Sequence, residues 1–200
     1  MGIQEGLMMA NCDIMTIVSH ARRIGWDTIS EQSVHRVTYL MKVLYAFCHE
    51  SLNVFDAYHF NVTVFGPYSD LINRSLVFLI SSQRIVEEQG GNLRIVSKDG
   101  VDVIADEKIR WIDTVLLILG KYGEQKVFSF VVNDPQYNCS VKANISAEIN
   151  CSSKSETVNT LNDFREAFEK TIDASNISKE EYIGLYFDFL FGQIIKGYEY

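Results

Sequence analysis

Apolar residues recur at steps of three and four along much of the chain, which is the period of amphipathic helices. The first such stretch runs through CDIMTIVSHARRIGW and ends near Gly25. The second follows Ser30, its predicted N-cap, with Ser33 as the alternative cap. Between Tyr39 and Phe47 this second stretch is apolar almost all round, so it predicts a central, buried helix.

The period changes from helical to alternating at YHFNVTVF, residues 58–65. Phe60, Val62 and Val64 fall on one side of this segment, while polar residues fall on the other. Such alternation over a short run is typical of a half-buried strand. The sequence therefore predicts a strand that places all three apolar side chains in the core.

A Gly-Pro pair follows the predicted strand. Gly66 permits a turn of the backbone, and Pro67 ends the strand because it has no amide to donate. Tyr68 and Ser69 come next, and Ser69 is the predicted N-cap of a helix that continues into LINRSLVFLI. Nothing like the phosphate-binding pattern G-x-x-x-x-G-K-[ST] surrounds the pair. These four residues are therefore interpreted as a structural corner.

The remaining pattern completes a small fold. RIVEEQGGNLRIVSKDG predicts a β-hairpin with a Gly-Gly-Asn turn, and residues 106–121 predict a helix with acidic residues first and Lys121 last. The order helix, helix, strand, helix, hairpin, helix favours a mainly helical α+β fold. We expect a winged-helix-like core, in which a single short strand closes the sheet of the hairpin, followed by a C-terminal helical appendage.

Regular patterning weakens after Gly123, which predicts two units, residues 1–123 and 124–200. VFSFVV is a candidate short strand, and the Asn/Ser-rich residues 133–156 are predicted to leave the fold and become ordered mainly on assembly. Two helices then end the chain, and the last of them starts at the capping residue Ser178.

The last predicted helix carries more aromatic surface than one apolar stripe can bury. One interpretation is that it packs on two sides within its own chain. The other is that it binds a partner subunit, because aromatic residues are enriched at protein interfaces. The candidate interface residues are Tyr182, Tyr186, Phe187, Phe189 and Phe191.

Charge argues against nucleic acid as the main ligand. The chain has 18 Lys and Arg against 26 Asp and Glu, a formal net charge of -8, which repels phosphate backbones at long range. DNA binding would need a local cluster of cations. The weak candidates for it are Arg74 on the predicted recognition helix and Arg94 and Lys98 on the hairpin.

Chemistry-bearing motifs are sparse. The four cysteines include no C-x-x-C pair, the four histidines include no H-E-x-x-H, and no G-x-S-x-G elbow is present. We expect reduced, buried thiols, partly exposed structural histidines, no cofactor, no metal and no enzymatic activity. The N-terminus lacks a signal-peptide pattern and the longest apolar run is TVLLILG, so we also expect a cytoplasmic protein that does not enter membranes.

Residues 33–105 carry a resemblance to known proteins. VTYLMKVLYAFCHES, then YHFNVTVFGPYSDLINRSLVFLISSQRIVEE, a hairpin and KDG are similar to small bacterial winged-helix proteins of the antitoxin-like SocA and YwgA type. Their most specific shared element is Gly66-Pro67-Tyr68-Ser69, and Phe65 stands where the pattern has Tyr. The stretch also resembles the small middle components of three-component ABC-ATPase defence systems, the Lamassu type included.

The resemblance implies an accessory subunit. The first hypothesis is a non-enzymatic subunit of a bacterial anti-phage complex that binds an SMC-like ATPase, an effector subunit or both. The alternative is a winged-helix DNA-binding regulator or antitoxin-like adaptor. A hydrolase or nuclease with a scattered site has no motif in its favour.

Overall fold

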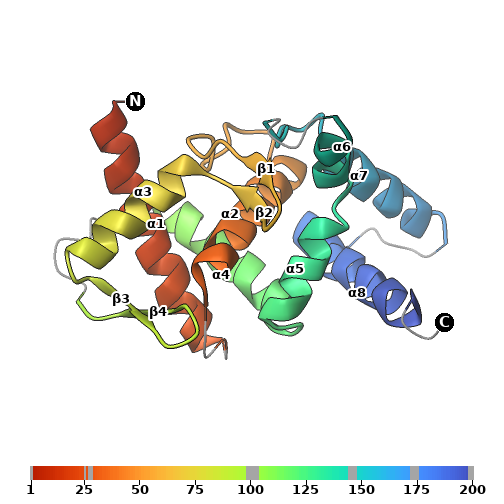
Figure 1. The fold of residues 1–200 in the computed structure, drawn as a ribbon. Helices are drawn as coiled ribbons and strands as arrows, with labels where there is room; N and C mark the ends of the chain where they lie inside the picture. Colours follow the sequence, from red (N-terminus) through yellow and green to blue (C-terminus); the bar gives the residue numbers. More distant parts are fainter. Residues whose placement is uncertain are drawn as a thin grey trace.

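The structure, a computed structural model, describes residues 2–24, 26, 29–97, 104–143, 148–171 and 176–197. Within these ranges the chain is mainly helical with two small antiparallel sheets, which is the α+β class that the sequence predicts (Figure 1). The helices are α1 (Ile3–Arg23), α2 (Glu31–Cys48), α3 (Asp70–Ser81), α4 (Asp106–Gly120), α5 (Glu124–Val132), α6 (Pro135–Ala143), α7 (Glu156–Glu169) and α8 (Lys179–Gly197). The strands are β1 (Asn61–Thr63), β2 (Gly66–Tyr68), β3 (Ile85–Glu88) and β4 (Asn92–Ile95).

Helix α2 is the central element, as its all-round apolar sequence predicts. It begins at Ser30, whose hydroxyl accepts a hydrogen bond from the Ser33 amide at 3.3 Å, so Ser30 and not Ser33 is the N-cap. It contacts helices on both sides of the predicted boundary at residue 123, among them α1, α4, α5, α7 and α8 (Figure 1). Side chains from both predicted units join one buried cluster around α2.

The winged-helix-like part consists of α1, α3 and the β3–β4 hairpin. Helix α1 packs against α3, and the hairpin contacts both helices. The Leu93 amide donates to the Ile29 carbonyl at 2.8 Å, and Ser30 forms an isolated bridge with Asn92, so the residues directly before α2 contact this hairpin without forming a third strand of its sheet. Residues 58–65 do not close this sheet, because β1 pairs with β2 in a sheet of its own.

The Gly-Pro corner is a hairpin of two strands. Thr63 pairs with Gly66 and Val62 pairs with Pro67, so the proline lies inside β2 and does not end a strand. Because the turn begins directly after Thr63, Val64 is 78% exposed, and its predicted place in the core is wrong. Two-residue turns of this kind join antiparallel strands, which the alternation of apolar residues alone does not reveal.

Gly66 has a backbone φ of +116°, a region that residues with a Cβ rarely adopt. A Cβ built there would lie 3.5 Å from Arg36 Nε, which is an ordinary van der Waals contact. The loss of stability on substitution would therefore come from the backbone conformation. We expect Gly66→Ala to lower the free energy of unfolding by about 1 to 2 kcal/mol. The matched control is Gly192→Ala in α8, where nothing lies within 4 Å of the added Cβ and helix propensity predicts a gain of about 0.5 to 1 kcal/mol. Urea unfolding measures both; equal effects of the two changes would refute the strain at Gly66.

The segment VFSFVV is helical, not a strand. Val127, Phe130 and Val131 are buried and repeat at steps of three and four, and α5 packs on α2 with that face. A short apolar run fits either period, and the preference for a strand was wrong here. Because these three residues occupy the inner face of the helix, Phe128 lies on the outer face of α5.

Residues 133–156 are not an excursion where the structure describes them. Asp134 is buried, accepts hydrogen bonds from the Tyr39 and Thr157 hydroxyls at 2.6 Å each, and caps α6 through the Tyr137 amide at 2.9 Å. The Ile149 amide donates to the Phe60 carbonyl at 2.7 Å and so extends β1. The prediction that this stretch leaves the fold is therefore wrong for residues 133–143 and 148–156, whereas its ordering mainly on assembly stays a prediction.

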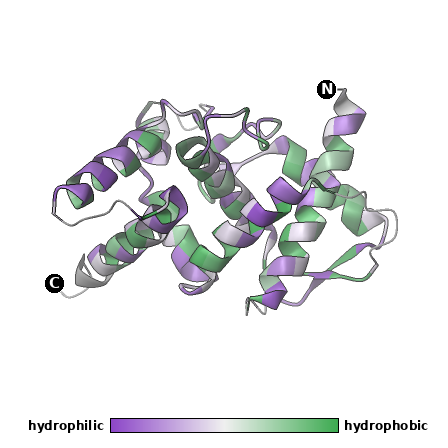
Figure 2. Ribbon diagram, turned by 180° about the vertical axis from the view of Figure 1, so that it is seen from behind, coloured by the Kyte–Doolittle hydropathy of each residue, from purple (hydrophilic) through white to green (hydrophobic). Residues whose placement is uncertain are grey.

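The hydropathy of the residues along the helices agrees with the packing described above. Seen from behind, the helices carry hydrophobic and hydrophilic residues in alternation along each ribbon, which is the pattern of amphipathic helices (Figure 2). None of the described helices is long and apolar enough to cross a membrane.

Candidate functional site

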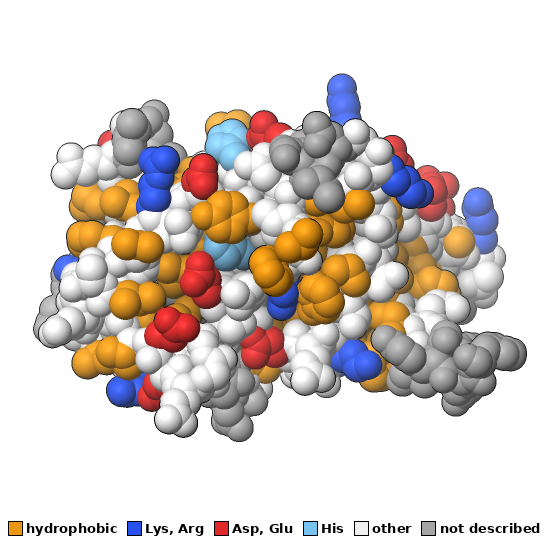
Figure 3. Space-filling model, viewed as in Figure 1, with side chains coloured by type: hydrophobic (Ala, Val, Ile, Leu, Met, Phe, Trp, Pro, Cys, Tyr) orange, Lys and Arg blue, Asp and Glu red, His pale blue; other side chains and the backbone are white. Residues whose placement is uncertain are grey.

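Apolar side chains gather at the β1–β2 turn. Val64 is 78% and Phe65 68% exposed at the turn itself, and Phe128 is 37% exposed on the neighbouring α5. With Arg36, which lies between them, these three residues are called the turn surface below. Figure 3 shows hydrophobic side chains at the centre of this face, over the β1–β2 hairpin and α5.

Arg36 joins the two halves of the turn surface. Its Nη2 and Nε donate to the Phe65 carbonyl at 2.9 and 3.3 Å, and its guanidinium carbon lies 4.5 Å from the centroid of the Phe128 ring. Burial lowers the pKa of Arg36, whereas the Glu124 carboxylate raises it. A half-buried guanidinium thus holds the turn against α5 and supports the ring by a cation–π contact.

Helix α5 is held in place by a carboxylate at the N-terminus of α2. Glu124 Oε1 accepts from the Ser30 amide at 3.0 Å and from the Ser30 hydroxyl at 2.7 Å, and it also accepts from the Ser33 hydroxyl. A negative charge is favoured at the positive end of a helix. Glu124 therefore holds α5, and with it Phe128, against the N-terminus of α2.

A hollow of about 390 Å³ lies beside the turn, between the hairpin and the first turns of α2. Val64, Phe65 and Tyr68 line one side of it, and His35 lines the other. The His35 ring stacks on Tyr68 with centroids 4.8 Å apart, and its Nδ1 accepts from the Ser69 amide at 3.1 Å. The hollow thus adds a mainly apolar depression to the turn surface.

Ser69 occupies the N-cap position of α3, as the sequence predicts, but its side chain makes no capping hydrogen bond. Its hydroxyl is buried without a hydrogen-bond partner among the described atoms. The hydrogen bond from the Ser69 amide to Nδ1 of His35 positions Ser69 instead. The predicted side-chain cap is therefore wrong. Gly66 and Pro67 are buried in β2, and Ser69 is buried between β2 and α3.

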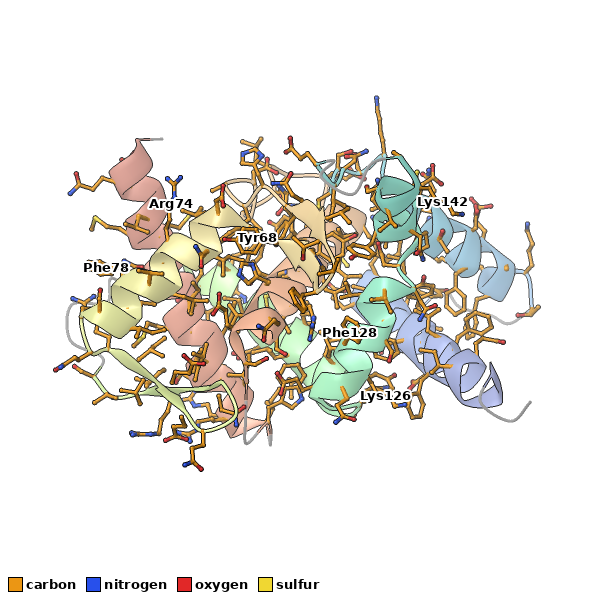
Figure 4. The ribbon with its side chains drawn as sticks, viewed as in Figure 1. Tyr68, Arg74, Phe78, Lys126, Phe128 and Lys142 are labelled. Carbon is orange, nitrogen blue, oxygen red and sulfur yellow. The ribbon has the colours of Figure 1, made fainter. Side chains whose placement is uncertain are left out.

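The candidate nucleic-acid residues are not brought together. Arg74 is exposed on α3, but the same helix exposes Val77 by 60% and Phe78 by 40%. Arg94 forms an ion pair with Glu88 in its own hairpin, and Lys98 lies outside the described residues. Figure 4 shows Arg74, Lys126 and Lys142 on three separate helices.

The C-terminal helix buries most of its aromatic side chains in its own chain. Tyr182 is 1%, Tyr186 5% and Phe187 2% exposed, so these three candidates are not available to a partner. They pack against α7 and α5, for example with Phe130 and Phe187 centroids 4.9 Å apart. Phe189 is 50% exposed and Phe191 is half-buried, and both stay predictions.

The described residues bear on the expectations for metal ligands, cysteines and histidines. No three His, Cys, Asp or Glu side chains among them are grouped so as to hold a metal ion. Burial raises the pKa of Cys48 and of Cys151 to about 12, so neither forms a thiolate nucleophile near neutral pH. The cysteines form no disulfide, and Cys139 is exposed, contrary to the expectation of burial. His35 is buried, contrary to the expected partial exposure of the histidines.

The sequence singled out the Gly-Pro corner but missed the side chains that the corner exposes. The alternating run at residues 58–65 does not reveal that Phe65 lies in a turn, and a strand interpretation of VFSFVV does not place Phe128 on the surface. A helical reading of that run, with Val127 and Phe130 inside, would have placed Phe128 on the surface.

Comparison with known proteins adds no relative: no protein-family model, no curated protein and no solved structure matches the chain.

Proposed function

We propose that this protein is a non-enzymatic accessory subunit that binds another protein through the turn surface. The observation that carries the proposal is the exposure of Val64, Phe65 and Phe128 around Arg36. Large apolar side chains exposed side by side mark interaction sites in folded proteins. Aromatic residues and arginine are also the types enriched at interface hot spots.

Rigidity strengthens this argument. The turn is held by the Arg36 bonds to Phe65, and α5 is held by Glu124 at the start of α2. A preorganised surface loses little conformational entropy when it binds, so more of the contact energy appears as affinity. The turn surface is therefore suited to stable assembly.

The resemblance of residues 33–105 extends the proposal to a particular setting. In that setting the partner is an SMC-like ABC ATPase, an effector subunit or both, and the complex is a cytoplasmic bacterial anti-phage system of the Lamassu type. The net charge of -8 suits a subunit whose own surface does not hold DNA.

A second candidate is a DNA-binding regulator or antitoxin-like adaptor, favoured by the winged-helix-like arrangement of α1, α3 and the β3–β4 hairpin. It requires affinity for duplex DNA that falls steeply with salt. The exposed residues Val77 and Phe78 on α3 do not favour phosphate contact.

Phe65→Ser tests the proposed function. When the tagged chain is purified from its native host, we expect the wild type to retain a partner protein. Phe65→Ser should retain about 10- to 30-fold less of this partner, which is the effect of removing a hot-spot aromatic residue. Stability should change little because Phe65 is 68% exposed.

Leu52→Ser is the matched control, since Leu52 is 89% exposed outside the turn surface. The proposal would be contradicted if the wild-type chain purified from the host as a monomer without a partner at physiological salt. Equal loss of the partner in Phe65→Ser and Leu52→Ser would contradict it as well. Salt-sensitive binding of the purified chain to duplex DNA, without a protein partner, would favour the second candidate.

A further inference from the structure

A second apolar depression lies between α4 and α8, away from the turn surface. It has a volume of about 610 Å³, and Leu117 and Ile118 of α4 form one side of it. Leu185 of α8 and Ile177, which precedes α8, form the other side. Leu117 is 61% exposed, whereas Trp111, Ile112, Val115, Leu116 and Leu119 of the same helix are buried.

Gly184 widens this groove. The glycine lies in α8 one residue before Leu185 and lines the depression. No atom lies within 4 Å of the position that its Cβ would occupy. The missing side chain therefore leaves room for a bulky group from outside, between the two helices.

Carboxylates border the groove on the α8 side. Glu180, Glu181 and Asp188 all line it. Glu181 accepts from the Ser178 amide at 2.7 Å, and Asp188 accepts from Lys121 Nζ at 2.8 Å and from the Tyr122 hydroxyl at 2.5 Å. Among the contacts just given, Lys121 is the one cation that faces these three carboxylates. The border is therefore net acidic.

We propose that the α4–α8 groove binds an amphipathic helix of a partner protein, with an apolar stripe in the groove and Lys or Arg residues facing Glu180, Glu181 and Asp188. A helix packs its side chains as ridges into the groove between two other helices. The acidic border selects a basic partner because complementary charge favours the correct complex.

The same charges argue against other occupants. A second copy of the chain, docked symmetrically, would bring one acidic border against another. Nucleic acid and anionic lipid are repelled by the border in the same way. An extended peptide gains nothing from main-chain pairing here, because the amides and carbonyls of α4 and α8 bond within their helices.

The inference rests on the proposed function only in making the chain a protein-binding subunit, and it is tested separately. The probe is a labelled synthetic helical peptide of about 18 residues with leucines at i, i+3, i+4 and i+7 and lysines on both flanks. The comparison peptide has glutamates in place of the lysines. Fluorescence anisotropy measures the binding of each peptide to the purified full chain.

We expect the lysine peptide to bind the wild type at least about tenfold more tightly than the glutamate peptide, and this difference to shrink as salt is added. Leu117→Glu and Gly184→Leu should each weaken binding of the lysine peptide about tenfold, the first by adding a charge to the groove and the second by filling it. Glu180→Lys should weaken it as well. Circular dichroism checks that each variant is folded.

Phe65→Ser is the control and should bind the lysine peptide as the wild type does, because Phe65 belongs to the turn surface. Equal binding of both peptides, no binding of either, or unchanged binding to Leu117→Glu would overturn the inference. Sedimentation showing a dimer that Leu117→Glu dissociates would assign the groove to a second copy instead. Loss of the partner in Phe65→Ser co-purification with intact peptide binding separates the two surfaces.

Discussion

Replacing Lys108 by Ala is expected to lower the free energy of unfolding by about 3 to 5 kcal/mol, which is the cost of leaving a buried charge without its partner. Lys108 is 5% exposed, and its Nζ lies 2.5 Å from Oδ2 of Asp13, which is fully buried. Oδ2 also accepts from the Tyr58 hydroxyl at 2.6 Å. Burial raises the pKa of Asp13, and Lys108 and Tyr58 offset part of that rise by stabilising the carboxylate.

Urea unfolding of three variants measures this effect. Lys121→Ala is the control, because its ion pair with Asp188 is about half exposed on both sides and should be worth less than about 1 kcal/mol. The triple variant Asp13→Leu, Lys108→Met, Tyr58→Phe removes the charges and the hydroxyl together and should recover much of the loss. Equal effects of Lys108→Ala and Lys121→Ala would show that the buried pair does not hold α1 to α4.

The sequence could not reveal this ion pair. Lys108 stands in DEKIRW at the start of α4, where a lysine usually reaches solvent, and Asp13 lies 95 positions earlier on the apolar side of α1. Only the packing of α1 on α4 brings them together. Local periodicity predicts which residues share a helix face, but it carries no information on which faces meet.

Elements whose own sequence fixes their period were predicted well. Helix α2 begins at the predicted cap Ser30, and α8 begins with the predicted cap Ser178, whose hydroxyl accepts from the Glu181 amide at 3.2 Å. The β3–β4 hairpin follows from its Gly-Gly-Asn turn. The short apolar run at α5 fits two periods, so only its tertiary contacts decide it.

Exposure was harder to predict than secondary structure. The aromatic C-terminal helix attracted the interface prediction, yet α5 and α7 cover Tyr182, Tyr186 and Phe187. Phe65 stays outside because the chain reverses directly after Thr63. Aromatic content therefore did not show which of these side chains are exposed, since an aromatic side chain in a core and one at an interface look alike in a sequence.

The two proposed surfaces would give the protein the form of an adaptor. The turn surface lies on the face seen in Figure 3. The groove is formed by α8 and by α4, and α4 runs behind α2 in Figure 1. Two separate contacts with one partner, or with two, would raise the overall affinity through effective concentration. A subunit of this kind needs no catalytic site to matter for an assembly.

Acid is expected to destabilise the protein through His35, by about 2 to 3 kcal/mol between pH 7.5 and pH 4.5. The ring is 4% exposed, and its Nδ1 accepts from the Ser69 amide at 3.1 Å, which requires a neutral imidazole. Burial, helped by the neighbouring Arg36 charge, lowers the pKa of His35 from 6.5 to about 4. The unfolded chain therefore binds a proton between these values while the folded chain does not, so stability falls as the pH falls through this window.

Urea unfolding of the wild type, His35→Gln and His59→Gln at pH 7.5 and pH 4.5 tests this pH dependence. Aspartates and glutamates titrate in all three proteins, so the difference between the wild type and His35→Gln isolates the histidine. His35→Gln should lose about 2 to 3 kcal/mol less than the wild type on acidification, even if it is less stable at pH 7.5. His59→Gln should behave as the wild type, because the side chain of His59 is 72% exposed. Identical acid losses in the wild type and His35→Gln would mean that His35 has the same pKa in the folded and the unfolded chain, which would refute the lowered pKa.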